Sequence, residues 1–353
     1  MNKKVLDHKC PACRAVIKWN PNLKKFKCEY CDSQFTLKQM EKFDNASNAK
    51  NNEGKKGEDI EYDQYSCKNC GAEIIADAET TATFCVYCGN TAIIKNKLSG
   101  KFAPDFIIPF KKTKEEAIEK FINLKKGRPL MPKNFNNKNN IEKIRGIYIP
   151  FWLFDVNISG SIDYVCKKIS TWSTSDYNYT KTDVYDVTRE GEFNYSKIPI
   201  DGSTHFDNNI MSSLEPFDYK ELEEYNHAYL SGFLAEKYNV DDKNSYKDIE
   251  MRAIENVKQK FKETTIGYTT SVIKNENLTG KINHTSYALL PVYMVNVKYG
   301  DKTYIFAMNG QTGEFIGDIP IDYVKTTIFG ILSLIIAFLI SFLVCYIIFI
   351  GGN

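Results

Sequence analysis

The sequence lacks the residue types and motifs that mark most enzyme active sites. Histidine occurs four times in 353 residues, at His8, His205, His227 and His284. No G-x-S-x-G nucleophile motif, H-E-x-x-H zinc motif, Walker A loop or G-x-G-x-x-G fingerprint occurs in the chain. Residues 201–205 place a serine between an acid and a histidine, but a turn explains that composition more simply. We therefore predict that the protein is not an enzyme, although a ligand-binding role for residues 101–325 stays open.

Net charge is also small, at +2, but it conceals an asymmetry between two segments. Residues 1–43 carry ten Lys and Arg against four Asp and Glu, a balance of +6. Residues 58–95 carry two against seven, a balance of −5. The first segment can attract nucleic acid or anionic lipid headgroups, whereas the second is a poor binder of polyanions.

One cysteine pattern, C-x2-C-x14-C-x2-C, occurs twice with an offset of 57 residues. Its members are Cys10, Cys13, Cys28 and Cys31 in the first copy and Cys67, Cys70, Cys85 and Cys88 in the second. This spacing is close to that of four-cysteine zinc sites, because two C-x-x-C turns brought together by a hairpin supply the four corners of a tetrahedron. The pattern predicts two zinc ribbons and two structural zinc ions per chain.

Other uses of these cysteines fit less well. Disulfides would require an oxidising compartment, and residues 1–9 contain no apolar run typical of a secretory signal. A redox C-x-x-C usually occurs singly beside a βαβ unit. A catalytic zinc ion needs an open coordination position, which four thiolates do not leave. Iron accepts the same four ligands, so zinc or iron stays open at this stage.

An apolar run ends the chain. Residues 326–350 contain no Asp, Glu, Lys, Arg or His over 25 positions. As a helix this run is roughly 37 Å long, against a bilayer hydrocarbon core of about 30 Å. We predict a single transmembrane helix that anchors the protein by its tail. Lys325 before the run and the reduced, metal-binding cysteines favour an N-terminal bulk in the cytoplasm.

The overall expectation is an α+β protein of five segments. They are a basic zinc ribbon (1–43), a flexible polar linker (44–58), an acidic zinc ribbon (59–97), an α+β body (98–325) and the transmembrane helix (326–350). The linker composition predicts that the first ribbon moves independently, while the second ribbon is docked on the body.

Within the body, apolar periodicity predicts short antiparallel strands and a few helices. The expected strands are 147–156, 162–172, 179–187, 192–200, 287–299, 302–308 and 314–319, with a turn at 309–313. Three helices are expected. One begins with a capping box at Thr113 and Glu116, and the other two span residues 221–238 and 245–261. Residues 149–156 and 290–297 share a proline, an aromatic residue two places later and a final valine, which suggests two similar half-domains.

Three further motifs accompany the cysteines: residues 102–110 (FAPDFIIPF), 150–154 (PFWLF) and 306–313 (FAMNGQTG). Together with the apolar tail they resemble a family of membrane proteins from low-GC Gram-positive bacteria, loosely described as TFIIB-type zinc-ribbon proteins. The resemblance covers nearly the whole chain and implies a single-pass membrane protein without established enzymatic activity. Some such relatives work beside phage-shock-protein-A-like and virion-core-like proteins in envelope stress. The term TFIIB-type describes the ribbon and implies no role in transcription.

Two functional hypotheses follow. The first is a membrane-tethered adaptor or scaffold that holds cytosolic protein partners at the inner face of the cell membrane. The alternative is a membrane-tethered regulator that binds nucleic acid or anionic lipid through its basic first ribbon, where Trp19, Phe26 and Tyr30 accompany the lysines.

Overall fold

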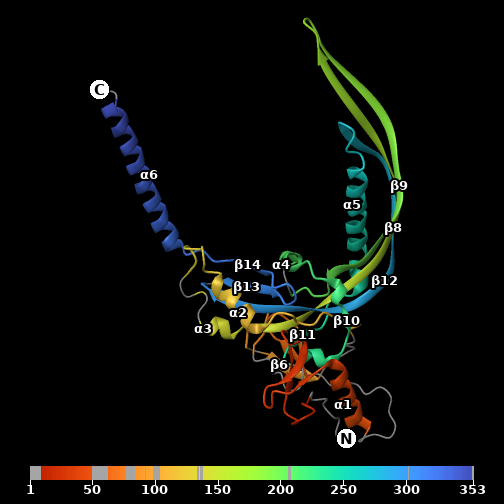
Figure 1. Ribbon diagram of the computed structural model, residues 1–353, viewed down its shortest axis with the longest axis vertical. Helices are drawn as coiled ribbons and strands as arrows, with labels where there is room; N and C mark the ends of the chain where they lie inside the picture. The colour runs from red at the N-terminus through yellow and green to blue at the C-terminus, as the bar shows by residue number, and fades with distance from the viewer. Residues whose placement is uncertain are drawn as a thin grey trace.

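The computed structural model describes residues 9–49, 63–76, 84–91, 93–97, 104–132, 135, 138–205, 208–300 and 302–351. This part of the chain is an α+β protein with mainly antiparallel sheets, two groups of four cysteines and one C-terminal apolar helix. The predicted fold class is confirmed in these terms. In Figure 1 the cysteine-bearing segments lie at one end of the molecule, and a long hairpin and the C-terminal helix project from the other.

The bounds of the elements follow the chain in three groups. The first cysteine unit, defined as residues 9–36, contains β1 (Ile17–Asn20), β2 (Lys25–Cys28) and β3 (Gln34–Phe35), and is followed by α1 (Leu37–Ala49). The second cysteine unit, defined as the described residues between 63 and 97, contains β4 (Asp63–Cys67), β5 (Glu73–Ala76) and β6 (Ile93–Lys97). The body contains β7 (Phe106–Ile107), α2 (Lys114–Asn123), α3 (Lys138–Glu142), β8 (Arg145–Ser173), β9 (Asn178–Asp201), α4 (Asn208–Leu214), η1 (Tyr219–Glu221), β10 (Glu223–Glu224), η2 (His227–Leu230), β11 (Leu234–Glu236), η3 (Asp242–Ser245), α5 (Tyr246–Glu263), β12 (Thr270–Tyr299), β13 (Lys302–Asn309), β14 (Phe315–Gly317) and α6 (Tyr323–Gly351).

One sheet joins the second cysteine unit to the body. Its strand order is β10-β7-β12-β8-β11-β5-β4-β6, with β9 added to β8 and with β13 and β14 added beside β12. The junction is the antiparallel pairing of β11 with β5, in which Ala235 lies opposite Ile75. The predicted docking of the second unit is therefore confirmed, and it occurs through backbone hydrogen bonds.

The four short strands predicted between residues 147 and 200 all fall in β-structure that pairs antiparallel, but they are two long strands, β8 and β9, and not four. They pair with each other from Phe151↔Asp201 to Ser173↔Asn178, and β12 runs along the other side of β8. The part of β8, β9 and β12 that projects from the body, here called the arm, curves around α5 (Figure 1). Gly160 lies opposite Gly191 inside the ladder of β8 and β9. A glycine in a strand marks a distortion as well as an end, and here the strands continue.

The predicted helix over residues 221–238 is also wrong. The segment contains β10, the short 3-10 helix η2 and β11. Gly232 has a φ of +84°, which is outside the helical region, and it separates η2 from β11. β11 then fills the gap between β8 and β5, so sheet pairing outweighs the helical periodicity of the segment.

Several local predictions are confirmed. Thr113 and Glu116 form a reciprocal capping box at the start of α2. The helix predicted over residues 245–261 is α5, whose buried face packs on the arm, although Ser245 makes no side-chain cap. The turn at residues 309–313 joins β13 to β14, and the Asn309 side chain accepts hydrogen bonds from two backbone N–H groups within it.

The two sequence repeats occupy equivalent places in the sheet. The carbonyl of Pro150 accepts a hydrogen bond from Gly202 at 2.9 Å, and the carbonyl of Pro291 accepts one from Gly310 at 2.8 Å. The aromatic residue two places after each proline also acts alike. The Trp152 indole donates to the Val240 carbonyl at 2.8 Å, and the Tyr293 hydroxyl donates to the Lys112 carbonyl at 3.0 Å.

Short parallel strands complete the equivalence. β11 lies parallel to β8 at Leu234↔Ile147, and β7 lies parallel to β12 at Phe106↔Ala288. Residues 147 and 288 stand at the same point of the two repeats, two residues before 149 and 290. The body is thus built from two similar halves whose central strands, β8 and β12, pair with each other.

The first cysteine unit is not independent of the body. The indole of Trp19, on β1, donates a buried hydrogen bond to the Phe110 carbonyl at 2.9 Å. The same ring packs edge-on against Tyr229, with centroids 5.0 Å apart, and Phe26 also contacts Tyr229. The predicted mobility of this unit is wrong, because long-range burial of a tryptophan outweighs the polar composition that follows it. Helix α1 also runs through residues 44–49 of the predicted linker, and residues 50–58 lie outside the described part of the chain.

Helix α6 leaves the body at Asp322 and Lys325. The ammonium group of Lys325 donates to the Met131 carbonyl at 2.5 Å, and the backbone N–H of Asp322 donates to the Leu130 carbonyl at 2.9 Å. From Tyr323 to Cys345 the helix has a mean hydropathy of 2.9 and is not buried in the protein. It is long and apolar enough to cross a membrane.

Replacing Trp19 tests the docking of the first unit. Trp19→Ala removes a buried ring and its hydrogen bond, so we expect the free energy of unfolding to fall by about 3–5 kcal/mol. Tyr30→Ala, at an 83% exposed position of the same unit, should change it by less than about 0.5 kcal/mol. Both are measured by denaturant unfolding of the full chain in detergent. Equal effects of the two substitutions would contradict the docking.

Candidate metal centres

The eight cysteines selected from the sequence form two compact groups. Within each group the four Sγ atoms lie within 4.8 Å of one another. The Sγ–Sγ separations include 3.6 Å for Cys10 and Cys31 and 3.6 Å for Cys67 and Cys88. These distances exceed the roughly 2.05 Å of a disulfide, and all eight thiols are free. A tetrahedral ion with ~2.3 Å bonds to sulfur separates its ligands by roughly 3.8 Å, so each group fits one metal ion.

The same backbone turn presents all four cysteine pairs. The N–H four residues after the first cysteine donates back to that cysteine's carbonyl, with distances of 2.9 to 3.0 Å. The residue that makes this bond always has a positive φ: 64° at Arg14, 57° at Asp32, 79° at Gly71 and 72° at Gly89. Glycine adopts this conformation freely, whereas Arg14 and Asp32 adopt it at a cost of roughly 1 kcal/mol each. The hydrogen bonds that close these turns must therefore offset the backbone strain at Arg14 and Asp32.

Local hydrogen bonds favour the thiolate form of one ligand in the first group. Bonds with the side chain and backbone of Ser33 lower the pKa of Cys31 to about 6. In each group two cysteines are buried and two are half-buried, and the four sulfur atoms saturate a tetrahedral ion. Such a centre is suited to bracing the fold and leaves no position for a substrate.

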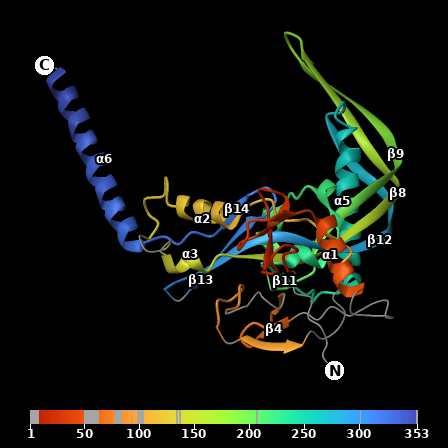
Figure 2. The ribbon, with the colours of Figure 1, turned by 60° about the horizontal axis from the view of Figure 1, so that its bottom comes forward.

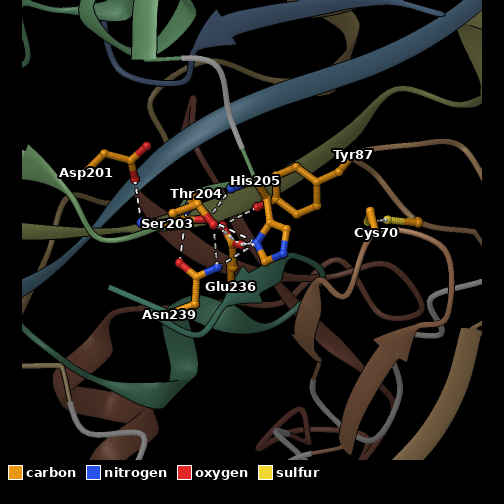
Figure 3. A network of polar contacts seen from close by, with 9 residues as sticks. Cys70, Tyr87, Asp201, Ser203, Thr204, His205, Glu236 and Asn239 are labelled. Atoms are coloured by element: carbon orange, nitrogen blue, oxygen red, sulfur yellow. Dashed lines mark hydrogen bonds and ion pairs between the residues drawn. The ribbon is translucent and has the colours of Figure 1, made fainter. Parts of the chain in front are cut away.

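A buried polar network adjoins the second group (Figure 3). At its centre is Glu236 on β11, which is fully buried. Its Oε1 atom accepts a hydrogen bond from the Ser203 hydroxyl at 2.6 Å and lies 2.7 Å from Nδ1 of His205. Its Oε2 atom accepts a hydrogen bond from the Tyr87 hydroxyl. The bond with Glu236 raises the pKa of His205, so an imidazolium can balance the buried carboxylate.

This network connects the body to the backbone that carries the ligands. Tyr87 lies between the third and fourth cysteines of the group, and the backbone of Cys70 lies close enough to His205 to raise the pKa of its imidazole. On the other side, the Asn296 amide on β12 donates to the Val86 carbonyl, between the same two cysteines. The second centre is therefore held by side chains from β11, β12 and the segment after β9. By contrast, aromatic packing holds the first unit.

Ser203 does not have the environment of a nucleophile. It is 3% exposed, and its hydroxyl donates to Glu236. Nδ1 of His205 lies 3.2 Å from the Ser203 hydroxyl oxygen but 2.7 Å from the same carboxylate oxygen of Glu236, so this nitrogen is shared with the carboxylate and is not a free base for the serine. The backbone N–H of Ser203 donates to the Asp201 side chain at 2.9 Å. The simple turn predicted for residues 201–205 is confirmed.

The chain is similar to the uncharacterized protein YdjG of Bacillus subtilis (strain 168). The two are 35% identical over 307 residues, which cover 73% of this chain and 90% of YdjG. The chain belongs to the YdjG family. No family model and no solved structure matches it.

Sequence reasoning selected the eight cysteines of both groups but missed the residues that fix the second group. Glu236 falls in a segment predicted as a helix, which hides its alignment with β5 and β8. Tyr87 occupies one of the two positions that the C-x2-C pattern leaves unspecified. In the sequence, His205 was considered only as part of the serine-containing turn at residues 201–205. No local signal identifies these residues, because their contacts join segments up to 149 positions apart.

Asp201 gives a test of the network based on pH. Burial raises its pKa to about 8, and its Oδ2 atom is buried without a hydrogen-bond partner. The folded state therefore retains a proton that the unfolded chain releases near pH 4, and stability should fall by roughly 1.4 kcal/mol per pH unit until about pH 8. Asn309 occupies the equivalent place in the other half, so Asp201→Asn is a conservative replacement.

We expect the Asp201→Asn variant to be more stable than the parent above pH 7, because it carries no charge to bury. The difference between the two free energies of unfolding should grow from pH 6.5 to 8 and then level off. Urea unfolding at half-unit steps measures it. A difference that is constant with pH would show that Asp201 does not titrate in this range.

Proposed function

We propose that the protein is a membrane-tethered zinc-ribbon adaptor that holds cytosolic protein partners at the inner face of the cell membrane. The observation that carries this proposal is the joining of three features in one molecule. Two four-cysteine groups pack on a single body, α6 is suited to span a membrane, and the arm extends away from both cysteine units. Adaptors need rigid placement of contact surfaces, which this arrangement provides.

Zinc is the metal that this proposal assigns to both groups. Four thiolates in tetrahedral arrangement are the usual ligands of structural zinc, and the cytoplasm keeps such thiols reduced. Small units of this size depend on such a metal for folding. The proposed role of both ions is structural, and the protein is proposed to act by binding and not by catalysis.

Elemental analysis tests the metal assignment. The purified, reduced chain should contain about two zinc ions and no stoichiometric iron. Cys10→Ser and Cys67→Ser should each lower the zinc content by one, because each removes a ligand from a different group. Cys166→Ser, at a buried cysteine outside both groups, should leave it at two. Iron in place of zinc, or fewer than two ions in the parent chain, would contradict the assignment.

The arm offers a surface for a partner. Trp172 and Tyr179 stack near its tip with centroids 5.5 Å apart, and they are 50% and 43% exposed. Tyr177 is 68% exposed beside them, and Val184 and Val272 are more than half exposed further along. Exposed aromatic and branched side chains in one region are typical of protein–protein contacts. The resemblance to envelope-stress membrane proteins suggests phage-shock-protein-A-like or virion-core-like partners.

The alternative is nucleic-acid binding through the basic first unit. Two of the three aromatic residues expected to stack on bases are not exposed. Trp19 and Phe26 are buried against the body, and Tyr30 is the exposed member of the three. Lys18 and Lys27 pair with Glu29 and Asp32 of the same unit. We therefore retain the adaptor as the proposed function.

Co-purification of the full chain from detergent-solubilised membranes tests the adaptor proposal. We expect a stoichiometric protein partner, and we expect the double variant Trp172→Ser with Tyr179→Ser to recover about tenfold less of it, the effect of losing ~1.4 kcal/mol of binding free energy. Met251→Ser, at a half-exposed apolar position on α5, is the matched control and should recover as much as the parent. The absence of any stoichiometric partner under all conditions would contradict the proposal.

A further inference from the structure

A cavity of about 610 Å³ lies where both cysteine units meet the body. The first unit lines it with Lys18 and Trp19, the second with Phe84, and the body with Lys114, Arg145 and Tyr293, among others. Pockets that hold small molecules have volumes of roughly 300–1,000 Å³ and combine apolar walls with a few converging polar groups. The cavity meets both criteria and is distinct from the two cysteine groups.

Its polar groups are mainly cations. Lys18 has a counter-charge, because its ammonium group lies 3.1 Å from both carboxylate oxygens of Glu29. The ammonium group of Lys114, the first residue of α2, is attracted by Glu115 and Glu142 but forms no ion pair within the described part of the chain. Arg145 donates through Nη1 to the carbonyls of Glu142 and Ile144, and its guanidinium group lies 5.1 Å from the centroid of Phe84. Lys114 and Arg145 thus line the cavity without a paired carboxylate.

The acidic residues that line the cavity do not form ion pairs with Lys114 or Arg145. Glu29 and Asp32 pair with Lys18 and Lys27 within the first unit. Glu115 follows Lys114 on α2 and attracts it, but Glu115 is exposed and forms no ion pair within the described residues. The region between Lys114 and Arg145 therefore keeps an excess of positive charge.

Mutual repulsion gives this excess an energetic cost. Burial lowers the pKa of Lys114, and the nearby charges of Arg145 and Lys18 lower it further, against the smaller opposite effect of Glu115 and Glu142. Burial also lowers the pKa of Arg145. A bound anion would relieve both effects, because an opposite charge at short range stabilises each cation.

We propose that this cavity binds a small organic molecule that carries a phosphate or carboxylate group, with the anion between Lys114 and Arg145 and the apolar part against Phe84, Phe233 and Tyr293. Phe233 and Tyr293 are 8% and 4% exposed, so they form a firm apolar wall. The ligand would contact both cysteine units and the body at once. It would therefore strengthen the docking of the units, which goes beyond the proposed adaptor function and does not depend on it.

Calorimetric titration of the full, metal-loaded chain in detergent tests the proposal with four probes. Phenyl phosphate and benzoate carry an anion on an aromatic ring, inorganic phosphate carries the anion alone, and benzyl alcohol carries the ring alone. We expect phenyl phosphate or benzoate to bind more tightly than inorganic phosphate, and benzyl alcohol not to bind. The stronger of the first two identifies phosphate or carboxylate as the preferred group.

Three variants locate the binding. Lys114→Gln should weaken it by about tenfold or more, as expected for the loss of a charge-assisted contact. Glu115→Gln should strengthen binding of the anion, because it removes a negative charge that repels the ligand. Partial unfolding cannot produce this gain. Lys125→Gln, on the exposed surface after α2, should have no effect. The proposal is overturned if neither aromatic anion binds, if benzyl alcohol binds as well as they do, or if Glu115→Gln weakens binding.

Discussion

The antiparallel pairing of β8 with β12 is the contact on which the rest of the structure depends. The two strands pair from Met294↔Arg145 to Thr270↔Lys167, with two register shifts along the way. At one end they form the core of the arm, where α5 packs on them. At the other end they form the centre of the body, where β7 pairs parallel to β12 and β11 pairs parallel to β8. β11 also pairs with β5 of the second cysteine unit. A chain without this pairing would have no common frame for its metal groups, arm and C-terminal helix.

The two halves that meet at this pairing have diverged around a shared backbone. Glu236 on β11 has the place that Ile108 has after β7, each two residues beyond the start of a parallel strand. Asp201 has the place of Asn309, and each side chain accepts a hydrogen bond from the N–H two residues later. In the first half these polar residues reach the second cysteine unit through Tyr87. In the second half the Asn309 amide donates to the Leu214 carbonyl instead. The first half thus supplies the side chains that hold the second four-cysteine group.

Local signals in the sequence predicted the features that depend on local structure. The cysteine spacing identified both groups, the capping box identified α2, and the uncharged run identified α6. The failures share one physical cause, which is that long-range pairing outweighed local composition. The segment 221–238 has helical periodicity, yet it contributes β11 because β5 and β8 both lack a neighbour there. Polar residues after the first unit suggested a mobile linker, yet Trp19 anchors that unit through a partner 91 positions away. The faint proline repeat, by contrast, coincides with matching backbone hydrogen bonds at Pro150 and Pro291.

The central claim is that both cysteine units are integral parts of the body fold. Hydrogen–deuterium exchange of the full chain before and after removal of its metals by a chelator tests this most directly. The account predicts faster exchange not only within residues 9–36 and 63–97, but also in η2 and β11, which contact the first and second units respectively. Faster exchange confined to the two cysteine units, with η2 and β11 unchanged, would contradict it.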